Sequence, residues 1–433
     1  MKAVLARIDL SRTLFLVSSK SGTTPETLAF FRYFWQKVGQ VTGTPGRHFV
    51  AITDPGTPLV HLAEERGSRR IFEAPPDVGG RYSALTVFGL LPAALIGVDI
   101  HRLLDRARTM AEVCAASVPE IANPGLTLEA ALGELARAGR DKVTFLTSPS
   151  LQAFPTWLEQ LIAESTGKGN RGIVPVADEP LAQPEAYGTD RFFVHLSLEG
   201  DDSSALDQRL KVLEAVGSPV VRIRLTEKTD LGQEFFRWEV AVAAAGAILG
   251  IHPFNQPDVQ LAKDLARQAM AEGSRRAGEQ GGEGGEIMSA AKGEALAHEL
   301  GAWLAKARPG DYVALHAYLA PTKERTAALQ KIRLALRDRL KLATTLGYGP
   351  RFLHSTGQLH KGGPNTGLFL QLVDEPAEDL PVPETGYTFG TLIRAQALGD
   401  FQALKQRGRR VLQVHLDGDV AGGLARLFVL VQG

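Results

Sequence analysis

The chain has 433 residues and a mass of 46.6 kDa, which at roughly 150 residues per domain predicts two or three domains. It carries 48 Lys and Arg residues against 48 Asp and Glu residues, so it has no excess positive charge to neutralise a nucleic-acid backbone. With 44% hydrophobic and 22% charged residues, the composition is that of a globular protein and excludes a disordered one.

Cysteine content and apolar runs exclude further classes. The single cysteine, Cys114, excludes an intrachain disulfide framework and a metal site of clustered cysteines. The longest apolar run, residues 240–251, is shorter than the about 20 residues that a membrane-spanning helix needs. Charged Arg7, Asp9 and Arg12 interrupt the stretch where a signal peptide would be apolar. We therefore expect a cytoplasmic protein with no membrane or nucleic-acid partner, no metal and no cofactor.

The first 122 residues alternate between strand-like and helix-like segments. Residues 13–19 form an apolar run of strand length, and residues 26–38 show helical spacing. Thr24, Pro25 and Glu26 supply the N-cap hydroxyl, the first-turn proline and the first-turn carboxylate of a helix start. The later segments are strands at 48–53 and 69–73 and helices at 58–66 and 82–95. This alternation predicts a parallel sheet covered by helices.

The same alternation returns at residues 123–271. Its segments are strands at 143–147, 173–176, 192–197 and 220–225 and helices at 154–165, 206–216 and 233–249. They predict a second parallel α/β domain. Residues 272–286 are Gly-rich and charged without apolar periodicity, so burial cannot offset their ordering entropy. We interpret residues 272–289 as a linker.

Residues 290–433 show a different order of elements. The segments are a strand at 312–319, a helix at 323–343, a strand near Phe352, a strand at 367–373, a helix at 389–405 and a strand at 411–416. This βαββαβ order is the split arrangement of ferredoxin-like domains. It predicts a C-terminal α+β domain.

One strand-to-helix turn, residues 17–27 (VSSKSGTTPET), concentrates polar side chains. Such a turn offers backbone N–H groups and a helix N-terminus to an anion. Hydroxyls and one ammonium are added by Ser19, Lys20, Ser21, Thr23, Thr24 and Thr27. A polar connection that caps the helix is the alternative, but six such residues in nine positions favour a phosphate site. The turn lacks G-x-x-x-x-G-K-[ST], so a nucleotide P-loop is not indicated.

This turn resembles the phosphate-binding signature of glucose-6-phosphate isomerases, which are built from sugar-isomerase (SIS) domains. Three further segments resemble that family in the same order: residues 79–83 (GGRYS), 160–168 (QLIAESTGK) and 255–263 (NQPDVQLAK). The resemblance implies an α/β protein with two SIS-type, three-layer, parallel-sheet domains, at residues 1–122 and 123–271, followed by the α+β extension at 290–433.

The resemblance implies interconversion of glucose 6-phosphate and fructose 6-phosphate through an enediolate. A proton leaves C2 and returns at C1, so one carboxylate acts first as a base and then as an acid. Glu164 is the matching residue. Arg81 would stabilise the enediolate, because a guanidinium stays charged, and Lys263 would assist ring opening. The remaining matched residues would bind the sugar or its phosphate: Gly80, Gln160 and Gln256.

Each of these residues also fits a structural role. Glu164 at a helix end fits a solvated acid, Arg81 a helix cap or an ion pair, and Lys263 a solvent-facing lysine. The whole set also fits a catalytically silent SIS module that binds a sugar phosphate. The carboxylate separates these hypotheses, because a protein that only binds has no need of a base.

The chain departs from the family in three respects. The first SIS strand and a glycine-serine turn lack a counterpart, so we expect an N-terminally truncated chain with an incomplete first domain and reduced activity. The family's ring-opening histidine has no counterpart in residues 175–193. The extension resembles that of the isomerase half of bifunctional transaldolase/glucose-6-phosphate isomerases. A transaldolase half and a second copy of the chain, in a homodimer, are the expected partners.

The extension contains a histidine that could replace the missing one. Residues 352–367 (FLHSTGQLHKGGPNTG) are predicted to form a glycine-rich loop between two strands. His360 would supply the imidazole, because an unperturbed histidine pKa of about 6.5 suits proton transfer at neutral pH. The alternative is a surface hairpin whose histidine touches only solvent or the adjoining domain. The predicted linker leaves the docking of the extension open.

Overall fold

The computed structural model describes residues 1–276, 288–291 and 293–433. Its contacts divide the chain into two compact units. The first unit holds Met1–Thr109, Leu231–Phe236 and Asp379–Phe389, and the second holds Met110–Asp230, Arg237–Glu378 and Gly390–Gly433. Most of the predicted linker lies outside the described residues. Its first residues continue a helix that ends at Arg276.

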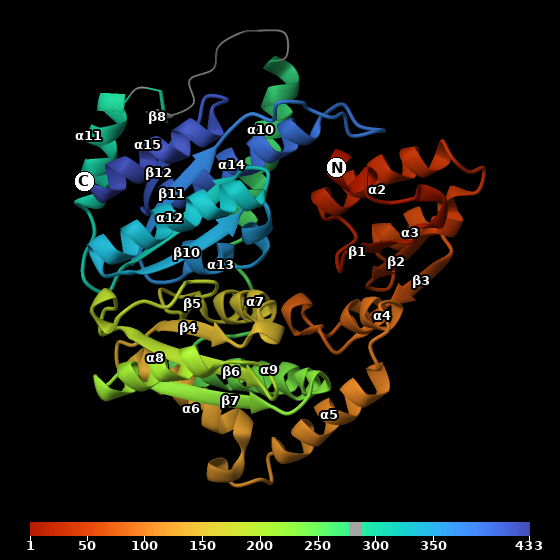
Figure 1. Cartoon of the computed structure of the whole chain (residues 1–433). Helices are drawn as coiled ribbons and strands as arrows, with labels where there is room; N and C mark the ends of the chain where they lie inside the picture. Colours follow the sequence, from red (N-terminus) through yellow and green to blue (C-terminus); the bar gives the residue numbers. More distant parts are fainter. Residues whose placement is uncertain (277–287, 292) are drawn as a thin grey trace. The chain divides into compact units, whose positions relative to one another are not determined.

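The first unit contains a parallel sheet of strand order β1-β2-β3 (Figure 1). The strands are Phe15–Ser18, Phe49–Thr53 and Arg70–Glu73, and the helices are α1 (Lys2–Leu5), α2 (Pro25–Gly39), α3 (Pro58–Glu65), α4 (Val87–Leu95) and the greater part of α5 (Ile100–Val113). All five residues of β2 are buried, as in a central strand with both faces covered. The predicted parallel α/β arrangement is confirmed here.

A distant piece of the chain belongs to this first unit. Phe389 stacks on the ring of Phe30 in α2, with centroids 5.7 Å apart. Glu384 lies 2.8 Å from the guanidinium of Arg66. Residues 379–389, which follow a strand of the C-terminal part of the chain, therefore complete the surface of the N-terminal sheet domain.

The second unit begins with a four-stranded parallel sheet of order β5-β4-β6-β7. In chain order, the strands β4 to β7 are Lys142–Thr147, Val174–Val176, Arg191–Leu198 and Val220–Leu225. The helices are α6 (Pro124–Arg137), α7 (Phe154–Thr166), α8 (Ser204–Ala215) and the greater part of α9 (Leu231–Leu249), with α10 (Gln260–Arg276) after them in the chain. Each predicted strand and helix of residues 123–249 has an observed counterpart within a few residues. This agreement confirms a second parallel α/β domain.

The C-terminal residues also form a parallel sheet, of order β10-β9-β11-β12-β8. Its strands are Met288–Ser289, Tyr312–Tyr318, Ala343–Tyr348, Gly367–Val373 and Arg410–His415, in the order β8 to β12, and its helices are α11 (Gly293–Leu304), α12 (Lys323–Leu340), α13 (Gly357–Gly362), α14 (Phe389–Gln406) and α15 (Val420–Gln432). The predicted ferredoxin-like α+β arrangement is therefore wrong, because all pairings described in this sheet are parallel.

The error arises at the end of α12. The predicted helix extends to residue 343, but Lys341 adopts a left-handed conformation, with φ of 58°, and ends the helix. Strand β10 then begins at Ala343, where β-branched Thr344 and Thr345 favour a strand. The predicted strand near Phe352 is instead a 3-10 helix, Arg351–His354. The true order alternates strand and helix throughout.

The two sheets of the second unit share a topology. When strands are numbered from β4 and from β9, both sheets have the order 2-1-3-4, with β8 added at one edge of the C-terminal sheet. This is the core order of doubly wound folds. The C-terminal domain is thus a further doubly wound domain of the same kind as its neighbour.

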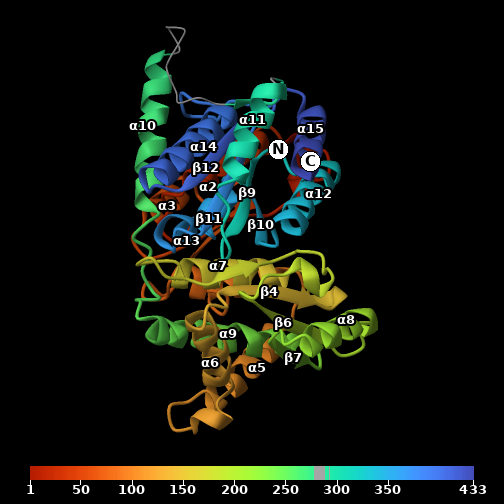
Figure 2. The same ribbon diagram turned by 90° about the vertical axis from the view of Figure 1, so that its left-hand side faces the viewer.

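The C-terminal domain packs firmly on the sheet β4–β7. One hydrophobic cluster draws residues from both, with Ala163, Val174 and Val176 on one side and Tyr312, Ala343, Leu359 and Phe369 on the other. Arg333 of α12 donates to the carbonyls of Ala177 at 2.9 Å and Asp178 at 3.1 Å. Figures 1 and 2 show α7 and α13 side by side where the two domains meet. The C-terminal extension therefore docks on its neighbouring domain through defined contacts, and the prediction that the linker leaves this docking open is wrong.

In the part of the chain that the structure describes, no helix combines the length and the apolar character needed to cross a membrane.

Candidate functional site

The predicted phosphate loop connects β1 to α2 in the first unit. Ser19 is buried, and its hydroxyl lies 2.8 Å from the hydroxyl of Thr24. Ser21 and Thr23 are paired in the same way, with 3.0 Å between their hydroxyl oxygens. Thr24 is the N-cap residue of α2, yet its hydroxyl makes no capping hydrogen bond to the first turn. The structure therefore does not support a helix-capping role for the Thr24 hydroxyl.

The lysine of the loop has an acidic partner. The Nζ atom of Lys20 lies 2.5 Å from Oδ2 of Asp54 at the end of β2, and 3.2 Å from the carbonyl oxygen of Pro76. Asp54 offsets part of the ammonium charge. The remaining groups suited to an anion are therefore the loop hydroxyls and the N-terminus of α2. The first turn of that helix contains half-buried Thr27.

Arg81 lies in a short 3-10 helix, Gly80–Tyr82, of the same unit. Its side chain is only 4% exposed, and its guanidinium carbon lies 5.4 Å from the centre of the Tyr82 ring. Gly80, by contrast, is exposed. A buried guanidinium stacked on an aromatic ring is held in a defined place, which suits a fixed cation.

Helix α7 of the second unit carries the predicted base. Glu164 is half-buried near the C-terminal end of the helix. One turn earlier, Nε2 of Gln160 donates to Oε2 of Glu164 over 3.2 Å. Gln160 therefore orients the carboxylate, which is a more specific role than the sugar contact predicted for it.

The segment that follows Glu164 is tied to the segment of the predicted lysine. Lys168 is 4% exposed, and its ammonium donates to the carbonyl of His252 at 2.9 Å, to Oδ1 of Asn255 at 3.2 Å and to the Asn255 carbonyl. Residues 160–168 and 255–263 thus meet in space. Sequence reasoning missed this role of Lys168, although the residue ends the quoted motif QLIAESTGK.

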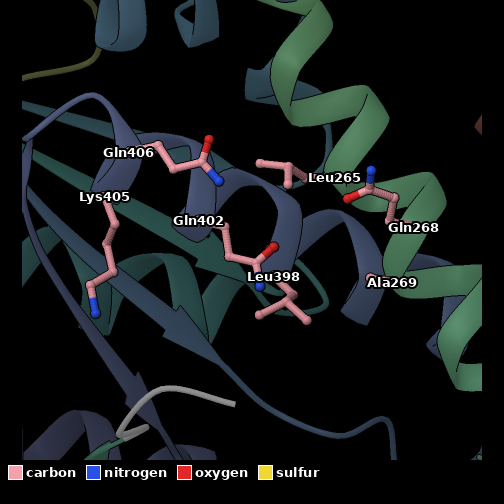
Figure 3. Close-up of a pocket in the computed structure, with 7 residues that line it drawn as sticks. All are labelled: Leu265, Gln268, Ala269, Leu398, Gln402, Lys405 and Gln406. Carbon is pink, nitrogen blue, oxygen red and sulfur yellow. The ribbon is translucent and has the colours of Figure 1, made fainter. Parts of the chain in front are cut away.

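Gln256 and Lys263 are both exposed, Gln256 before α10 and Lys263 within it. Farther along α10, a pocket of about 350 Å³ separates this helix from α14 (Figure 3). The pocket is lined by Leu265, Gln268 and Ala269 of α10 and by Leu398, Gln402, Lys405 and Gln406 of α14. None of the predicted site residues is among them, so we do not include this pocket in the candidate site.

His360 occupies a different environment from the one predicted. It lies in helix α13 rather than in a loop, it is 2% exposed, and its Nδ1 atom is 2.9 Å from the hydroxyl of Tyr312. Burial lowers the pKa of His360 well below its ordinary value, and neighbouring His316 and Lys361 lower it further. The prediction of a glycine-rich loop is wrong, and this enclosed imidazole is poorly placed to reach a sugar oxygen.

Across residues 1–276, 288–291 and 293–433, no group of three or more His, Cys, Asp or Glu side chains is arranged to hold a metal ion.

Comparisons with known proteins bear on this arrangement. Residues 1–178 match the family model of phosphoglucose isomerase. Glucose-6-phosphate isomerase of Parabacteroides distasonis is 30% identical over 285 residues, 57% of this chain and 64% of that protein. That of Symbiobacterium thermophilum is 34% identical over 288 residues, 57% of this chain and 63% of that protein. The chain thus spans slightly less than two thirds of these relatives.

A solved structure gives the same indication for the fold. The crystal structure of a glucose-6-phosphate isomerase from Chlamydia trachomatis matches with a TM-score of 0.52 and 22% identity, over 63% of this chain and 62% of that one. It supports the shared α/β architecture. The residues that match the family model include the phosphate loop, the Gly-Arg motif and the Glu164 segment.

Proposed function

We propose that this protein interconverts glucose 6-phosphate and fructose 6-phosphate by proton transfer through an enediolate. The observation that carries the proposal is the carboxylate of Glu164, oriented by Gln160 on a buried helix that Lys168 fastens to the segment of Lys263. A surface acid has no need of such support, whereas a general base must be held in a defined geometry.

The remaining matched residues have roles that suit the same reaction. Ser19, Lys20, Ser21, Thr24 and Thr27 would bind the phosphate through hydroxyls, the ammonium and the N-terminus of α2. Arg81, with its neighbour Gly80, would stabilise the negative charge of the enediolate. Exposed Lys263 and Gln256 would contact the sugar, Lys263 at the ring oxygen. The burial of His360 does not favour a direct part in ring opening, so we give it none in this scheme.

Proton exchange at the sugar carbon tests the base directly. Fructose 6-phosphate is incubated with the protein in D₂O, and NMR follows both deuterium incorporation and glucose 6-phosphate formation. Glu164→Gln preserves shape but cannot accept the proton, so both rates should fall by about 10²–10⁴-fold, the usual contribution of such a group. Glu185→Gln, which alters an exposed glutamate of the same unit, is the matched control and should leave both rates unchanged.

The alternative of a catalytically silent SIS module gives a different result. Such a protein would bind fructose 6-phosphate in a calorimeter, and the natural sequence would incorporate no deuterium. Exchange at the original rate in Glu164→Gln would instead assign the base to another residue.

We further propose a cytoplasmic location, in line with the single cysteine, and a homodimer. The doubly wound domain at residues 290–433, beyond the matched family segments, supports a relation to bifunctional transaldolase/glucose-6-phosphate isomerases. Immunoblotting for a larger product in the source cell and light scattering of the purified chain test the fusion and the dimer respectively.

A further inference from the structure

We propose that Gln358 of the C-terminal domain is a positioning residue for the isomerisation, holding together the segments that carry Glu164 and Lys263. The inference rests on the proposed function. It assigns a purpose to the C-terminal domain, which the matched family segments do not include.

Gln358 is fully buried in α13, and its amide group bridges both segments. Its Nε2 atom donates to the carbonyl of Gly167, three residues after Glu164, over 2.9 Å, and to Oδ2 of Asp258 over 2.8 Å. Its Oε1 atom accepts from the backbone N–H of Asp258 over 2.9 Å. One amide thus fixes the end of α7 and the chain five residues before Lys263.

Helix α13 is in close contact with the Glu164 segment. A Cβ atom at Gly167 would lie 2.3 Å from the Cα atom of Leu359, so only glycine allows this approach of the two backbones. The backbone N–H of Asn170 donates to the carbonyl of Gly362 over 3.0 Å. The glycine of the ESTGK motif is therefore required by the close approach of the C-terminal domain.

The other side of α13 is anchored in the C-terminal domain. The ammonium of Lys361 lies 2.6 Å from Oδ1 of Asp400 in α14, with both side chains buried. Arg409, which precedes β12, donates to the carbonyls of Lys361 at 2.6 Å and Gly363 at 2.7 Å. His360 contacts Tyr312 of β9. Gln358 therefore extends from a rigid support, as a group that positions other residues must.

Gln358 acts through these segments and needs no contact with the sugar. Displacing a reacting group by about 1 Å can cost 10²-fold in rate, even when the change lies far from the chemistry. Loss of the amide should therefore lower kcat, whereas KM should change little, because the proposed phosphate ligands belong to the other unit.

The test compares two buried glutamines of the C-terminal domain. Gln358→Met removes the amide hydrogen bonds at nearly constant length. Gln371→Met is the matched control, because Gln371 is also fully buried and hydrogen-bonded, to the Ala397 carbonyl at 3.2 Å, to Asp400 at 3.3 Å and to Gln413, none of which belongs to the two segments. Both variants should lose thermal stability.

Only Gln358→Met should lower kcat, by about tenfold or more, with KM for fructose 6-phosphate within about twofold. Hydrogen-exchange mass spectrometry should show faster exchange at residues 164–170 and 255–263 in Gln358→Met and not in Gln371→Met. Equal loss of kcat in the two variants, or an unchanged kcat in Gln358→Met, would overturn the inference.

The two readouts separate this inference from the proposed function. If the natural sequence does not isomerise the sugar but Gln358→Met alone loosens both segments, the proposed function fails and the coupling of the segments stands. If Gln358→Met does not fold, Asp258→Ala is the substitute variant. It removes one hydrogen bond of Gln358 and the ion pair with Arg407, whose side chain is 42% exposed. It should lower kcat by a smaller factor, and an unchanged kcat there would also reject the inference.

Discussion

The hydroxyl pair of Ser19 and Thr24 makes the phosphate loop testable at a single residue. Hydrogen bonds to charged groups contribute about 1.5–3 kcal/mol each, so Thr24→Ala should weaken fructose 6-phosphate binding about tenfold or more. Isothermal titration calorimetry measures the change. The variant should lose only about 0.5–1.5 kcal/mol of stability, because the Thr24 hydroxyl does not cap α2 and its loss removes one hydrogen bond, to Ser19.

Thr42→Ala is the matched control for this prediction. Thr42 also belongs to the first unit, and its hydroxyl faces that of Thr44 at 3.5 Å outside the loop. The Thr42→Ala variant should bind fructose 6-phosphate with the same affinity as the natural sequence. An unchanged affinity in Thr24→Ala would remove this residue from the phosphate site.

Single residues also explain where sequence reasoning about the site stopped. The motif residues Glu164 and Gln160 are one helical turn apart, so their hydrogen bond follows from spacing alone. The contacts of Lys168 with His252 and Asn255 join residues more than 80 positions apart, which no local pattern reports. The glycine neighbours of His360 predict a loop between two strands, and only packing reveals that the residue is buried in α13.

At the scale of elements, the packing of α10 against α14 depends on Gly399. A Cβ atom there would lie 2.7 Å from the backbone nitrogen of Ala266 and 2.8 Å from the carbonyl oxygen of Ala262, so α10 would have to move. Gly399→Ala should therefore destabilise the protein by about 1–3 kcal/mol, the usual cost of overpacking. Denaturant unfolding measures this change.

The control for Gly399 is a glycine in an open helix. Gly301 lies within α11, where an added Cβ atom meets no other atom within 4 Å. Gly301→Ala should stabilise the chain by up to about 1 kcal/mol, because alanine has the higher helix propensity. The two substitutions are thus expected to have opposite signs. A stabilised Gly399→Ala variant would contradict the close packing of α10 and α14.

On the scale of the whole molecule, the domains of the second unit should remain together without a covalent link. They share a hydrophobic cluster and the hydrogen bonds of Arg333. A protease site inserted between residues 277 and 287 would allow the chain to be cut there. After cleavage, the two fragments should elute as one species in size-exclusion chromatography and separate only in denaturant. Separation without denaturant would show that the shared core is too weak to hold the domains together.

The sequence by itself determined the local elements and the motifs. Apolar runs and helical spacing predict the strands of residues 1–249 closely and most of their helices, although α5 and α6 were not predicted, because their periodicity is set by burial of one face or both. The polar turn at residues 17–27, the Gly-Arg motif and the Glu164 and Lys263 segments were likewise recognisable, because each is a contiguous pattern. The one large error, the predicted α+β arrangement, came from the end of α12. Lys341 ends that helix with a positive φ, and no neighbouring residue in the sequence predicts this conformation.

Only the tertiary structure decided how distant segments serve one another. The parallel pairing of β9 with β10 and β11 turned a presumed α+β extension into a second doubly wound domain. The same folding brought the amide of Gln358 to Gly167 and Asp258, residues 191 and 100 positions away. Hydrogen bonds of this kind depend on the meeting of surfaces from separate domains. Local periodicity reports which face of an element is buried, but it does not identify the partner that covers it.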